Sequence, residues 1–449
     1  MVEPENNPNS KNMVDPSNFV RFVMAKFYSR VTSAKQIRKK RIAFEKNRQA
    51  SKADHVVEYF HQLDDPYSHL TAQIIARLAA RYDIKIVPHL VRASGGDNQP
   101  ELQKLATWAR RDAELVAPHY GLSFPSSAGL SPDLESQQAA AAALSGMKAE
   151  DFIENIEQIS QSSWLGESIA QSQSGESEVS QKLDQGSARL AQLEHYSGAT
   201  FYYGGEWYWG VDRLFYLEQR LRDLGACHAP NEPYLVSRPA IDVSGVDASH
   251  LELHFYPSLN SPYTSIIFDK TLELAKTCNI KFRHKPVLPM IMRGVPATLI
   301  KGKYIYFDTK READFLGVPF EKQVTPIGTP TRQAYSLFPW ASSLGKDTQL
   351  HSVLLRNAWS EGRGLHKKAN MRRAVEEAGL DWREAVQHMG SDDWKSFVEQ
   401  NQREMVERMG LWGVPSYRLS GPDGEPDLTV WGQDRLWLIA AEIRRRASL

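Results

Sequence analysis

The sequence predicts an α/β protein built from two tandem domains, each with an inserted helical subdomain. One observation is a repeated phrase, an apolar strand-like run followed by a tight turn and a helix opened by Pro-Tyr, found at residues 65–68 and 261–264. The other is the order of elements after each copy: a helix, a second strand, a long helical stretch, a hairpin and a final helix. This order is that of an α/β domain with a helical insertion, and its recurrence indicates an internal repeat.

Composition is consistent with this organisation. The chain has 449 residues, of which 41% are hydrophobic and 24% charged, which is typical of soluble globular protein and too long for one ordinary domain. Lys plus Arg and Asp plus Glu both total 54, so zero net charge gives no global attraction to nucleic acid or membrane. No apolar run is long enough to cross a bilayer and no signal-peptide pattern occurs, so we expect a cytoplasmic protein.

The cysteine content argues against a disulfide framework and against a metal site. Cys227 and Cys278 are the two cysteines, and the sequence contains neither a C-x-x-C nor a Cys/His cluster. Cys278 ends a helix-like stretch, which favours a buried thiol over a reactive one.

The N-terminal region has two parts. Residues 1–17 are rich in Asn, Pro and Ser and are expected to be disordered. Residues 18–50 form a basic amphipathic pattern that predicts a helix on an anionic membrane surface or a protein partner. The alternative is a helix packed across the following domain with its basic face in solvent. The apolar positions of the pattern are Phe19, Phe22, Val23, Phe27 and Val31.

The first predicted domain spans residues 51–228. Its expected elements are a strand at 56–60, a helix at 70–81, a second strand at 84–91 and a hairpin with a final helix from 198.

The second predicted domain spans residues 251–449. The segment 229–250 holds three prolines and is interpreted as a linker. The expected elements of the second domain are a strand at 253–256, a helix at 266–277, a second strand at 280–288 and a hairpin with a final helix from 413.

Three motifs of the second copy carry a resemblance to a known family. They are Ser-Pro-Tyr at 261–263, Gly-Val-Pro at 413–415 and Trp-Gly-Gln-Asp-Arg at 431–435. In this order they resemble motifs of DsbA-like thioredoxin-fold proteins, in the branch of 2-hydroxychromene-2-carboxylate isomerases and kappa-class glutathione transferases. The resemblance runs from residue 54 to the C-terminus as two copies. It implies two thioredoxin-like folds, glutathione as cofactor and a small-molecule electrophile as substrate.

Ser261 precedes the helix-opening Pro, at a helix N-terminus where unpaired N–H groups and the helix dipole favour an anion. Such a site with a hydroxyl donor lowers a thiol pKa from about 8.5 toward neutrality. By resemblance, Ser261 is the catalytic residue that donates a hydrogen bond to the sulfur of glutathione. The alternative is a helix N-cap without further role, since Ser is a preferred cap.

Four more residues are assigned to glutathione by resemblance. Val414-Pro415 resembles the cis-Pro loop whose backbone pairs with the cysteinyl part of the ligand, although a trans Pro in a plain loop is the alternative. Asp434, with Gln433 beside it, would bind the amino group of the γ-glutamyl arm, and a helix N-cap is the alternative for Asp434.

Three residues near the expected cleft are ambiguous. Lys301 would meet a carboxylate of glutathione or of substrate, with a solvated surface charge as the alternative. Tyr263 and Trp359 are interpreted chiefly as packing residues, because aromatic side chains bury a large area wherever they lie.

The first copy departs from the family pattern at two positions. Asp65 stands where the second copy has Ser, and Thr200 stands at the position of the loop Pro. A carboxylate would repel a thiolate by roughly 4 kcal/mol at about 4 Å for an effective dielectric of about 20. We therefore expect Asp65 to be a helix cap and the first copy to be degenerate. It would pair with the second copy as in a pseudo-dimer, with a homodimer of the whole chain as the other arrangement.

Three functions are compatible with these observations. The leading hypothesis is a glutathione-dependent isomerase or transferase acting by thiolate addition at the second copy. Disulfide exchange is opposed because neither turn contains the cysteine that must attack. A non-catalytic module that binds a peptide or partner is favoured by Asp65, Thr200 and the basic N-terminal helix.

Overall fold

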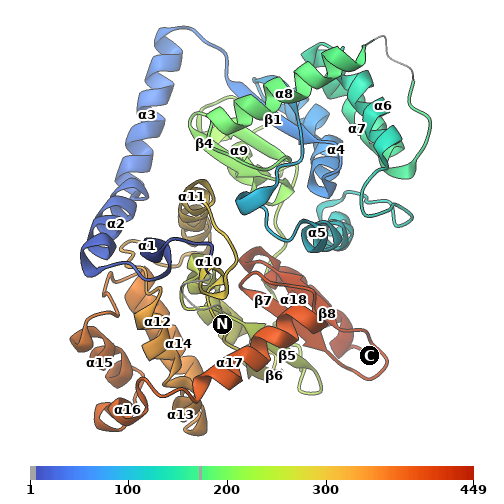
Figure 1. The fold of residues 1–449 in the computed structure, drawn as a ribbon. Helices are drawn as coiled ribbons and strands as arrows, with labels where there is room; N and C mark the ends of the chain where they lie inside the picture. The colour runs from blue at the N-terminus through green and yellow to red at the C-terminus, as the bar shows by residue number, and fades with distance from the viewer. Residues whose placement is uncertain (1–6, 171–173) are drawn as a thin grey trace. The chain divides into compact units, whose positions relative to one another are not determined.

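The computed structural model describes residues 7–170 and 174–449, which form two compact units (Figure 1). The N-terminal unit is Arg38–Pro239. The C-terminal unit is Ala240–Leu449 together with the described part of Met1–Ile37. The boundary between units therefore falls within the predicted linker, but the N-terminal segment joins the C-terminal half, which no local pattern had indicated.

The N-terminal unit contains a four-stranded sheet of order β2-β1-β3-β4. Its strands are β1 (Val56–Gln62), β2 (Lys85–Val91), β3 (Thr200–Tyr203) and β4 (Glu206–Trp209). β1 pairs with β2 in parallel and with β3 antiparallel, and β3 and β4 form a hairpin.

Helices of the N-terminal unit surround this sheet and include the helical insertion between β2 and β3 (Figure 1). They are α4 (Pro66–Arg81), η2 (Gly96–Asn98), α5 (Leu102–Val116), η3 (Ala117–Tyr120), α6 (Leu134–Ser145), α7 (Ala149–Leu165), α8 (Glu176–Gln192) and α9 (Val211–Asp223).

The C-terminal unit repeats the same strand order, β6-β5-β7-β8, with the same directions of pairing. Its strands are β5 (Glu252–Tyr256), β6 (Lys281–His284), β7 (Ser416–Ser420) and β8 (Leu428–Trp431). β6 is shorter than the predicted strand at 280–288. Pro286 lacks the N–H that would continue the ladder.

The helices between β6 and β7 form the helical subdomain of the C-terminal unit. The helices of this unit are α10 (Pro262–Thr277), η4 (Met290–Arg293), α11 (Leu299–Leu316), α12 (Thr329–Tyr335), α13 (Phe338–Ser343), α14 (Asp347–Trp359), α15 (Lys368–Glu377), α16 (Trp382–His388), α17 (Trp394–Arg403), η5 (Glu404–Arg408), η6 (Gln433–Arg435) and α18 (Leu436–Ala447).

Both cores are built around a cross-strand aromatic pair at the same place in the sheet. Tyr59 lies opposite Phe201 with ring centroids 4.9 Å apart, and Phe255 lies opposite Tyr417, also at 4.9 Å. All four side chains are fully buried. Stacked aromatic pairs contribute beyond their buried area, so the two sheets are held by equivalent contacts.

The expectation of disorder over 1–17 is corrected for residues 7–17, while residues 1–6 lie outside the described part. Helix α1 (Lys11–Val14) forms here. The Asn9 side chain donates to the carbonyl of Val295 at 3.0 Å and accepts from the N–H of Ala297 at 3.1 Å. Such long-range amide contacts satisfy backbone groups of the C-terminal unit, and composition alone does not reveal them.

The single basic helix expected at 18–50 is two helices, α2 (Asn18–Val31) and α3 (Ala34–Ala50). The break coincides with Thr32, whose hydroxyl bonds back to the carbonyl of Tyr28 at 2.7 Å. Among the described residues, no helix combines the length and the apolar character needed to cross a bilayer.

Candidate functional site

Ser261 ends the turn between β5 and α10. Its backbone is extended, and its Oγ accepts a hydrogen bond from the N–H of Thr264 at 3.1 Å, with Pro262 at the first helical position. The side chain is 7% exposed. The capping bond uses a lone pair of Oγ, and the hydroxyl proton is donated to the carbonyl of Val414 over 3.5 Å. This is a long contact that a bound anion could replace, so the cap and an anion-binding role are compatible.

The loop that faces Ser261 comes from the start of β7. The Val414–Pro415 peptide bond is cis, as the resemblance predicts. Ser261 Oγ lies 3.5 Å from the carbonyl oxygen of Val414. The N–H of Gly432 donates to the carbonyl of Pro415 at 2.9 Å. These contacts bring the helix terminus, the cis-Pro loop and the loop before α18 together.

Gln433 and Asp434 follow Gly432 in η6. Gly432 is the N-cap of η6 and Arg435 that of α18, so Asp434 is not the cap that the alternative interpretation proposed. The Gln433 side chain is 3% exposed and donates through Nε2 to Glu312 at 2.6 Å. Its Oε1 is buried without a hydrogen-bond partner. A buried, unpaired acceptor is uncommon and suits a site that receives a donor.

Lys301 lies in the first turn of α11, which packs against α10. Its backbone N–H is capped by the Thr298 hydroxyl at 3.2 Å. The side chain is half-buried, and burial lowers the pKa of Lys301 to about 8. The interpretation of Lys301 as a solvated surface charge is therefore wrong.

Two acids of α11 were missed in the sequence. Asp308 is 1% exposed and accepts a hydrogen bond from the hydroxyl of Tyr263 at 2.8 Å, while Glu312 is fully buried beside Gln433. Lys301, Asp308 and Glu312 share one face of α11, because seven and eleven residues are close to whole turns. One signal in the sequence could have pointed to Asp308: a Tyr and an Asp are separated by the same 45 positions in both copies, Tyr263 and Asp308 in the second and Tyr67 and Asp112 in the first.

The turn that carries Ser261 is fixed from its inner side by two aromatic residues. Trp359 Nε1 donates to the carbonyl of Leu259 at 3.0 Å. The Tyr335 hydroxyl accepts from the N–H of Leu259 at 3.1 Å and donates to the carbonyl of Val287 at 2.8 Å. Trp359 is a packing residue as expected, and its indole N–H also holds the turn.

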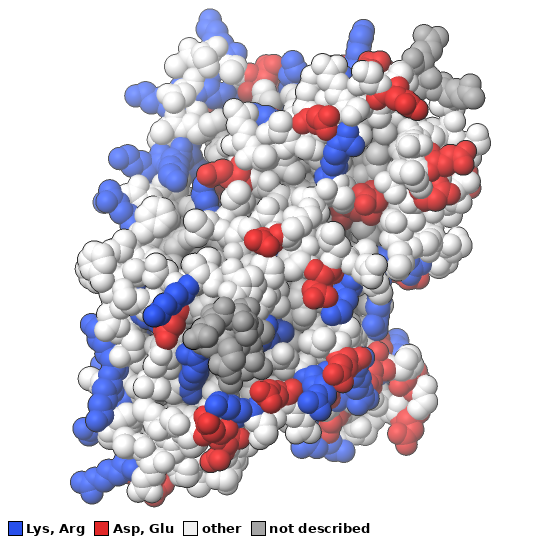
Figure 2. Space-filling view, viewed as in Figure 1, with Lys and Arg blue, Asp and Glu red and all other residues white. Residues whose placement is uncertain are grey.

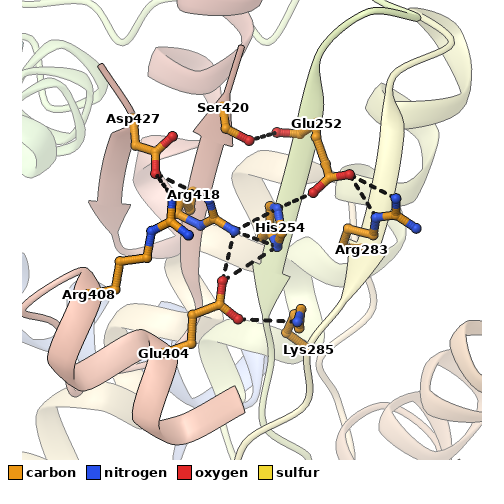
Figure 3. Close-up of polar contacts among 9 residues, drawn as sticks. All are labelled: Glu252, His254, Arg283, Lys285, Glu404, Arg408, Arg418, Ser420 and Asp427. Atoms are coloured by element: carbon orange, nitrogen blue, oxygen red, sulfur yellow. Dashed lines mark hydrogen bonds and ion pairs between the residues drawn. The ribbon is translucent and has the colours of Figure 1, made fainter. Parts of the chain in front are cut away.

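A charged network joins the sheet to the helical segment that leads into the cis-Pro loop (Figure 3). Glu404 of η5 contacts Arg418 of β7 at 2.7 Å and Lys285 at 3.2 Å. Arg418 Nη2 lies 2.7 Å from Nε2 of His254 on β5. Burial and then the charge of Arg418 lower the pKa of His254 to about 4, so His254 is neutral near pH 7. This network anchors η5 against the sheet.

The equivalent turn of the N-terminal unit has different chemistry. The Asp65 carboxylate caps α4, accepting from the N–H of Ser68 at 2.9 Å and from its hydroxyl at 2.8 Å. This confirms the cap predicted for Asp65. Burial raises the pKa of Asp65 to about 6.

Thr200 is buried and donates to the carbonyl of Ser197 at 3.0 Å, as Ser416 donates to that of Gly413 at 2.8 Å. The strand register also matches Thr200 to Ser416, so the prediction that Thr200 replaces the loop Pro is wrong by one residue. Ala199 stands at that position, since its carbonyl accepts from the N–H of Gly210 as that of Pro415 accepts from Gly432.

Neither cysteine lies at these turns. Cys278 is fully buried at the C-terminus of α10, with Sγ 3.2 Å from the carbonyl of Leu274, as the sequence predicted. Cys227 is half-buried and unpaired. Over residues 7–170 and 174–449, no group of His, Cys, Asp and Glu is arranged to hold a metal ion.

Residues 252–444 match the family described as DSBA-like thioredoxin domain, and the C-terminal unit therefore has a thioredoxin-like fold. Three solved structures are similar to the chain. A 2-hydroxychromene-2-carboxylate isomerase is 20% identical, with a TM-score of 0.36, over 43% of this chain and 95% of that chain. The cytosolic disulfide reductase DsbM from Pseudomonas aeruginosa is 18% identical, with a TM-score of 0.33, over 43% and 98%. A probable DsbA oxidoreductase from Streptomyces coelicolor is 14% identical, with a TM-score of 0.36, over 44% and 91%. No curated protein is similar enough to count as a match.

Proposed function

We propose that the protein is a glutathione-dependent isomerase or transferase that works at the C-terminal unit, and that the N-terminal unit is a diverged copy of the same fold. The observation that carries the proposal is the position of Ser261. A hydroxyl, and not a thiol, stands at the N-terminus of the 16-residue helix α10 and faces the carbonyl of Val414 beside the cis Pro415. A thioredoxin-like site that lacks a cysteine thiol of its own is suited to using the thiol of a bound cofactor such as glutathione.

The polar groups around Ser261 fit the parts of glutathione. The backbone of Val414 would pair with the cysteinyl amide, and the Asp434 carboxylate would hold the α-ammonium of the γ-glutamyl arm. The unpaired Oε1 of Gln433 supports this assignment, since it is a buried acceptor that lacks a donor. Bound glutathione would supply a thiol for attack on an electrophilic carbon.

Ser261 would act by stabilising charge. Its hydroxyl proton can be donated to a sulfur while Oγ accepts from Thr264, and the helix terminus adds a favourable field. A helix terminus and a hydroxyl donor together favour the thiolate, which is the reactive form near neutral pH. Lys301, whose pKa burial lowers to about 8, remains mostly cationic at pH 7 and would hold a carboxylate of glutathione or of the substrate.

Disulfide exchange is less well supported. The attacking group must be a thiolate, and the two cysteines are a fully buried Cys278 at the far end of α10 and Cys227 in the other unit. The Asp65 carboxylate at the equivalent helix terminus of the N-terminal unit argues against an anion there, so we place one site in the chain.

Titration calorimetry of glutathione into the full chain tests the proposal. Ser261→Ala removes both the cap and the donor, whereas Ser261→Asp keeps a cap, as Asp65 demonstrates, and adds a charge that repels a thiolate. Asp434→Asn should also weaken binding, and Asp212→Asn, the matched change in the N-terminal unit, should not. If wild type and Ser261→Asp bind glutathione with equal affinity, the role assigned to Ser261 is wrong. If wild type shows no detectable affinity for glutathione, the alternative of a non-catalytic domain that binds a peptide or partner is favoured.

A further inference from the structure

Helix α2 buries a charged side chain and exposes four apolar ones. The side that faces the C-terminal unit carries Arg21, which is 2% exposed. Its guanidinium donates to the carbonyls of Thr325 at 2.9 Å and Ile327 at 2.6 Å and pairs with Asp15 at 2.8 Å. A buried cation with three hydrogen bonds therefore helps to attach the helix, together with the Tyr28 ring, which stacks on Tyr306 with ring centroids 4.0 Å apart.

The apolar side of α2 faces solvent instead. Phe19, Phe22, Val23 and Phe27 are 75%, 59%, 48% and 58% exposed. Their spacing of three, four and eight residues places them on one face of the helix. An apolar stripe of this size is not left in water without a function, since contiguous exposed patches mark interaction surfaces. This face also contradicts the expectation that the apolar positions of the basic helix pack across the following domain.

A groove with basic walls lies beside the stripe. Its volume is about 810 Å³, and Phe22, Lys26 and Arg30 of α2 line it together with Lys322 and Lys367 from the facing loops. One acid, Glu321, also lines the groove, but its carboxylate is paired with Lys310 Nζ at 2.8 Å. The unneutralised charge of the groove is therefore positive, and six of its lining residues come from α2.

The surroundings of α2 carry the same sign of charge. From Pro16 to Phe44 the sequence contains no Asp or Glu. Lys and Arg side chains continue along α3, as Figure 2 shows. Because the whole chain has zero net charge, this is a local field, directed at whatever approaches α2.

We propose that the exposed face of α2 binds the surface of a bilayer that contains anionic phospholipids. The phenylalanines enter the boundary between headgroups and acyl chains, and Lys26 and Arg30 meet the phosphates, as in other amphipathic helices that lie on membranes. The basic groove receives a headgroup. A second copy of the chain is a poorer occupant, because a two-fold contact would place identical basic side chains against each other.

Vesicle co-sedimentation of the full chain tests this proposal. Vesicles of phosphatidylcholine alone are compared with vesicles that also contain phosphatidylserine, at low and high salt. Binding is expected only with phosphatidylserine and is expected to weaken with salt. Each basic side chain near an anionic surface contributes about fivefold in affinity, so Lys26→Gln with Arg30→Gln should weaken binding about 25-fold.

Matched variants separate the face of α2 from general effects. Phe22→Ser with Phe27→Ser should abolish sedimentation. Leu344→Ser with Val386→Ser, which alters two side chains that are 51% and 44% exposed elsewhere in the unit, should leave it unchanged. The far-UV circular dichroism spectra and the urea unfolding midpoints of the α2 variants should equal those of wild type, which shows that they fold and keeps this test independent of the proposed function.

Two results would overturn the proposal. One is equal sedimentation with both kinds of vesicle, since charge would then have no part in it. The other is a stable dimer by light scattering that the phenylalanine variants convert to monomer, with no vesicle binding by wild type. That result would assign the stripe to a second copy of the chain.

Discussion

Tyr263 and Asp308 form a hydrogen bond that recurs in the N-terminal half of the chain between another Tyr and another Asp. The Tyr263 hydroxyl donates to Asp308 Oδ2 at 2.8 Å, and the Tyr67 hydroxyl donates to Asp112 Oδ2 at 2.8 Å; in each pair the acceptor lies 45 positions after the donor. The two pairs align the halves residue by residue, from the helix that follows the turn to the first helix of the insertion. This register makes each half a matched control for the other.

Tyr263→Phe should lower the free energy of unfolding of the C-terminal unit by about 1.5–3 kcal/mol, because a bond to a buried carboxylate is lost. Tyr67→Phe should have the same effect on the N-terminal unit. Urea unfolding, with tryptophan fluorescence and circular dichroism as probes, measures both. A substantially smaller effect at Tyr263 would indicate that water or another donor replaces the hydroxyl at Asp308.

Ser261→Asp should abolish glutathione binding while leaving the free energy of unfolding close to that of wild type. The carboxylate can cap α10 as Asp65 caps α4, but it repels a thiolate by roughly 4 kcal/mol at an effective dielectric of about 20. Ser261→Ala should lose about 1 kcal/mol of stability with the cap. Calorimetry of binding and thermal unfolding of the two variants separate the cap from the donor.

The two residues of the Gln433–Glu312 hydrogen bond are replaced by valines in the first copy. Aligning the Tyr–Asp pairs matches Val116 to Glu312, and aligning the final motifs matches Val211 to Gln433. Both valines are buried. Gln433→Val alone should destabilise the C-terminal unit by about 2–3 kcal/mol, since the buried Glu312 loses this partner. Adding Glu312→Val should recover most of that loss.

A double-mutant cycle in urea measures this coupling. The double variant should remain folded and fail to bind glutathione, because the buried acceptor of Gln433 is gone. Retained binding would exclude Gln433 from the site.

The stability of the C-terminal unit should depend on pH through His254. Burial and the Arg418 charge lower the pKa of His254 to about 4, whereas an unfolded histidine titrates near pH 6.5. Between these values the unfolded state binds more protons. The free energy of unfolding therefore falls as the pH falls from about 6.5 to about 4, by on the order of 3 kcal/mol.

His254→Gln should reduce this slope, and His250→Gln, at an exposed position, should not. Urea unfolding at several pH values tests it. An unchanged slope in His254→Gln would assign the acid sensitivity to other buried histidines of the unit.

Features defined by short stretches of sequence could be predicted. The Pro-Tyr turns, the helices after them and the caps at Asp65 and Ser261 depend on residues within one or two turns of each other. The cis bond before Pro415 followed from a resemblance over three motifs.

The break in the basic helix after Val31 was missed although the sequence marks it, because Ser33 and Gln36 have the Ser-x-x-Gln spacing of a helix start. In the structure the Ser33 hydroxyl accepts from the N–H of Gln36 at 3.4 Å, and the Thr32 hydroxyl bonds to the carbonyl of Tyr28 at 2.7 Å.

The sequence by itself determined the strand and helix order of the two halves and the chemistry at each helix-opening turn, because hydrophobic period, Pro and capping residues act locally. Only the tertiary structure decided which side of α2 is buried, that the N-terminal segment joins the C-terminal unit, and that Glu312 meets Gln433. These outcomes depend on partners more than a hundred residues away. Arg21 is stable inside because the carbonyls of Thr325 and Ile327 receive it, and no pattern around Arg21 reveals that they are there.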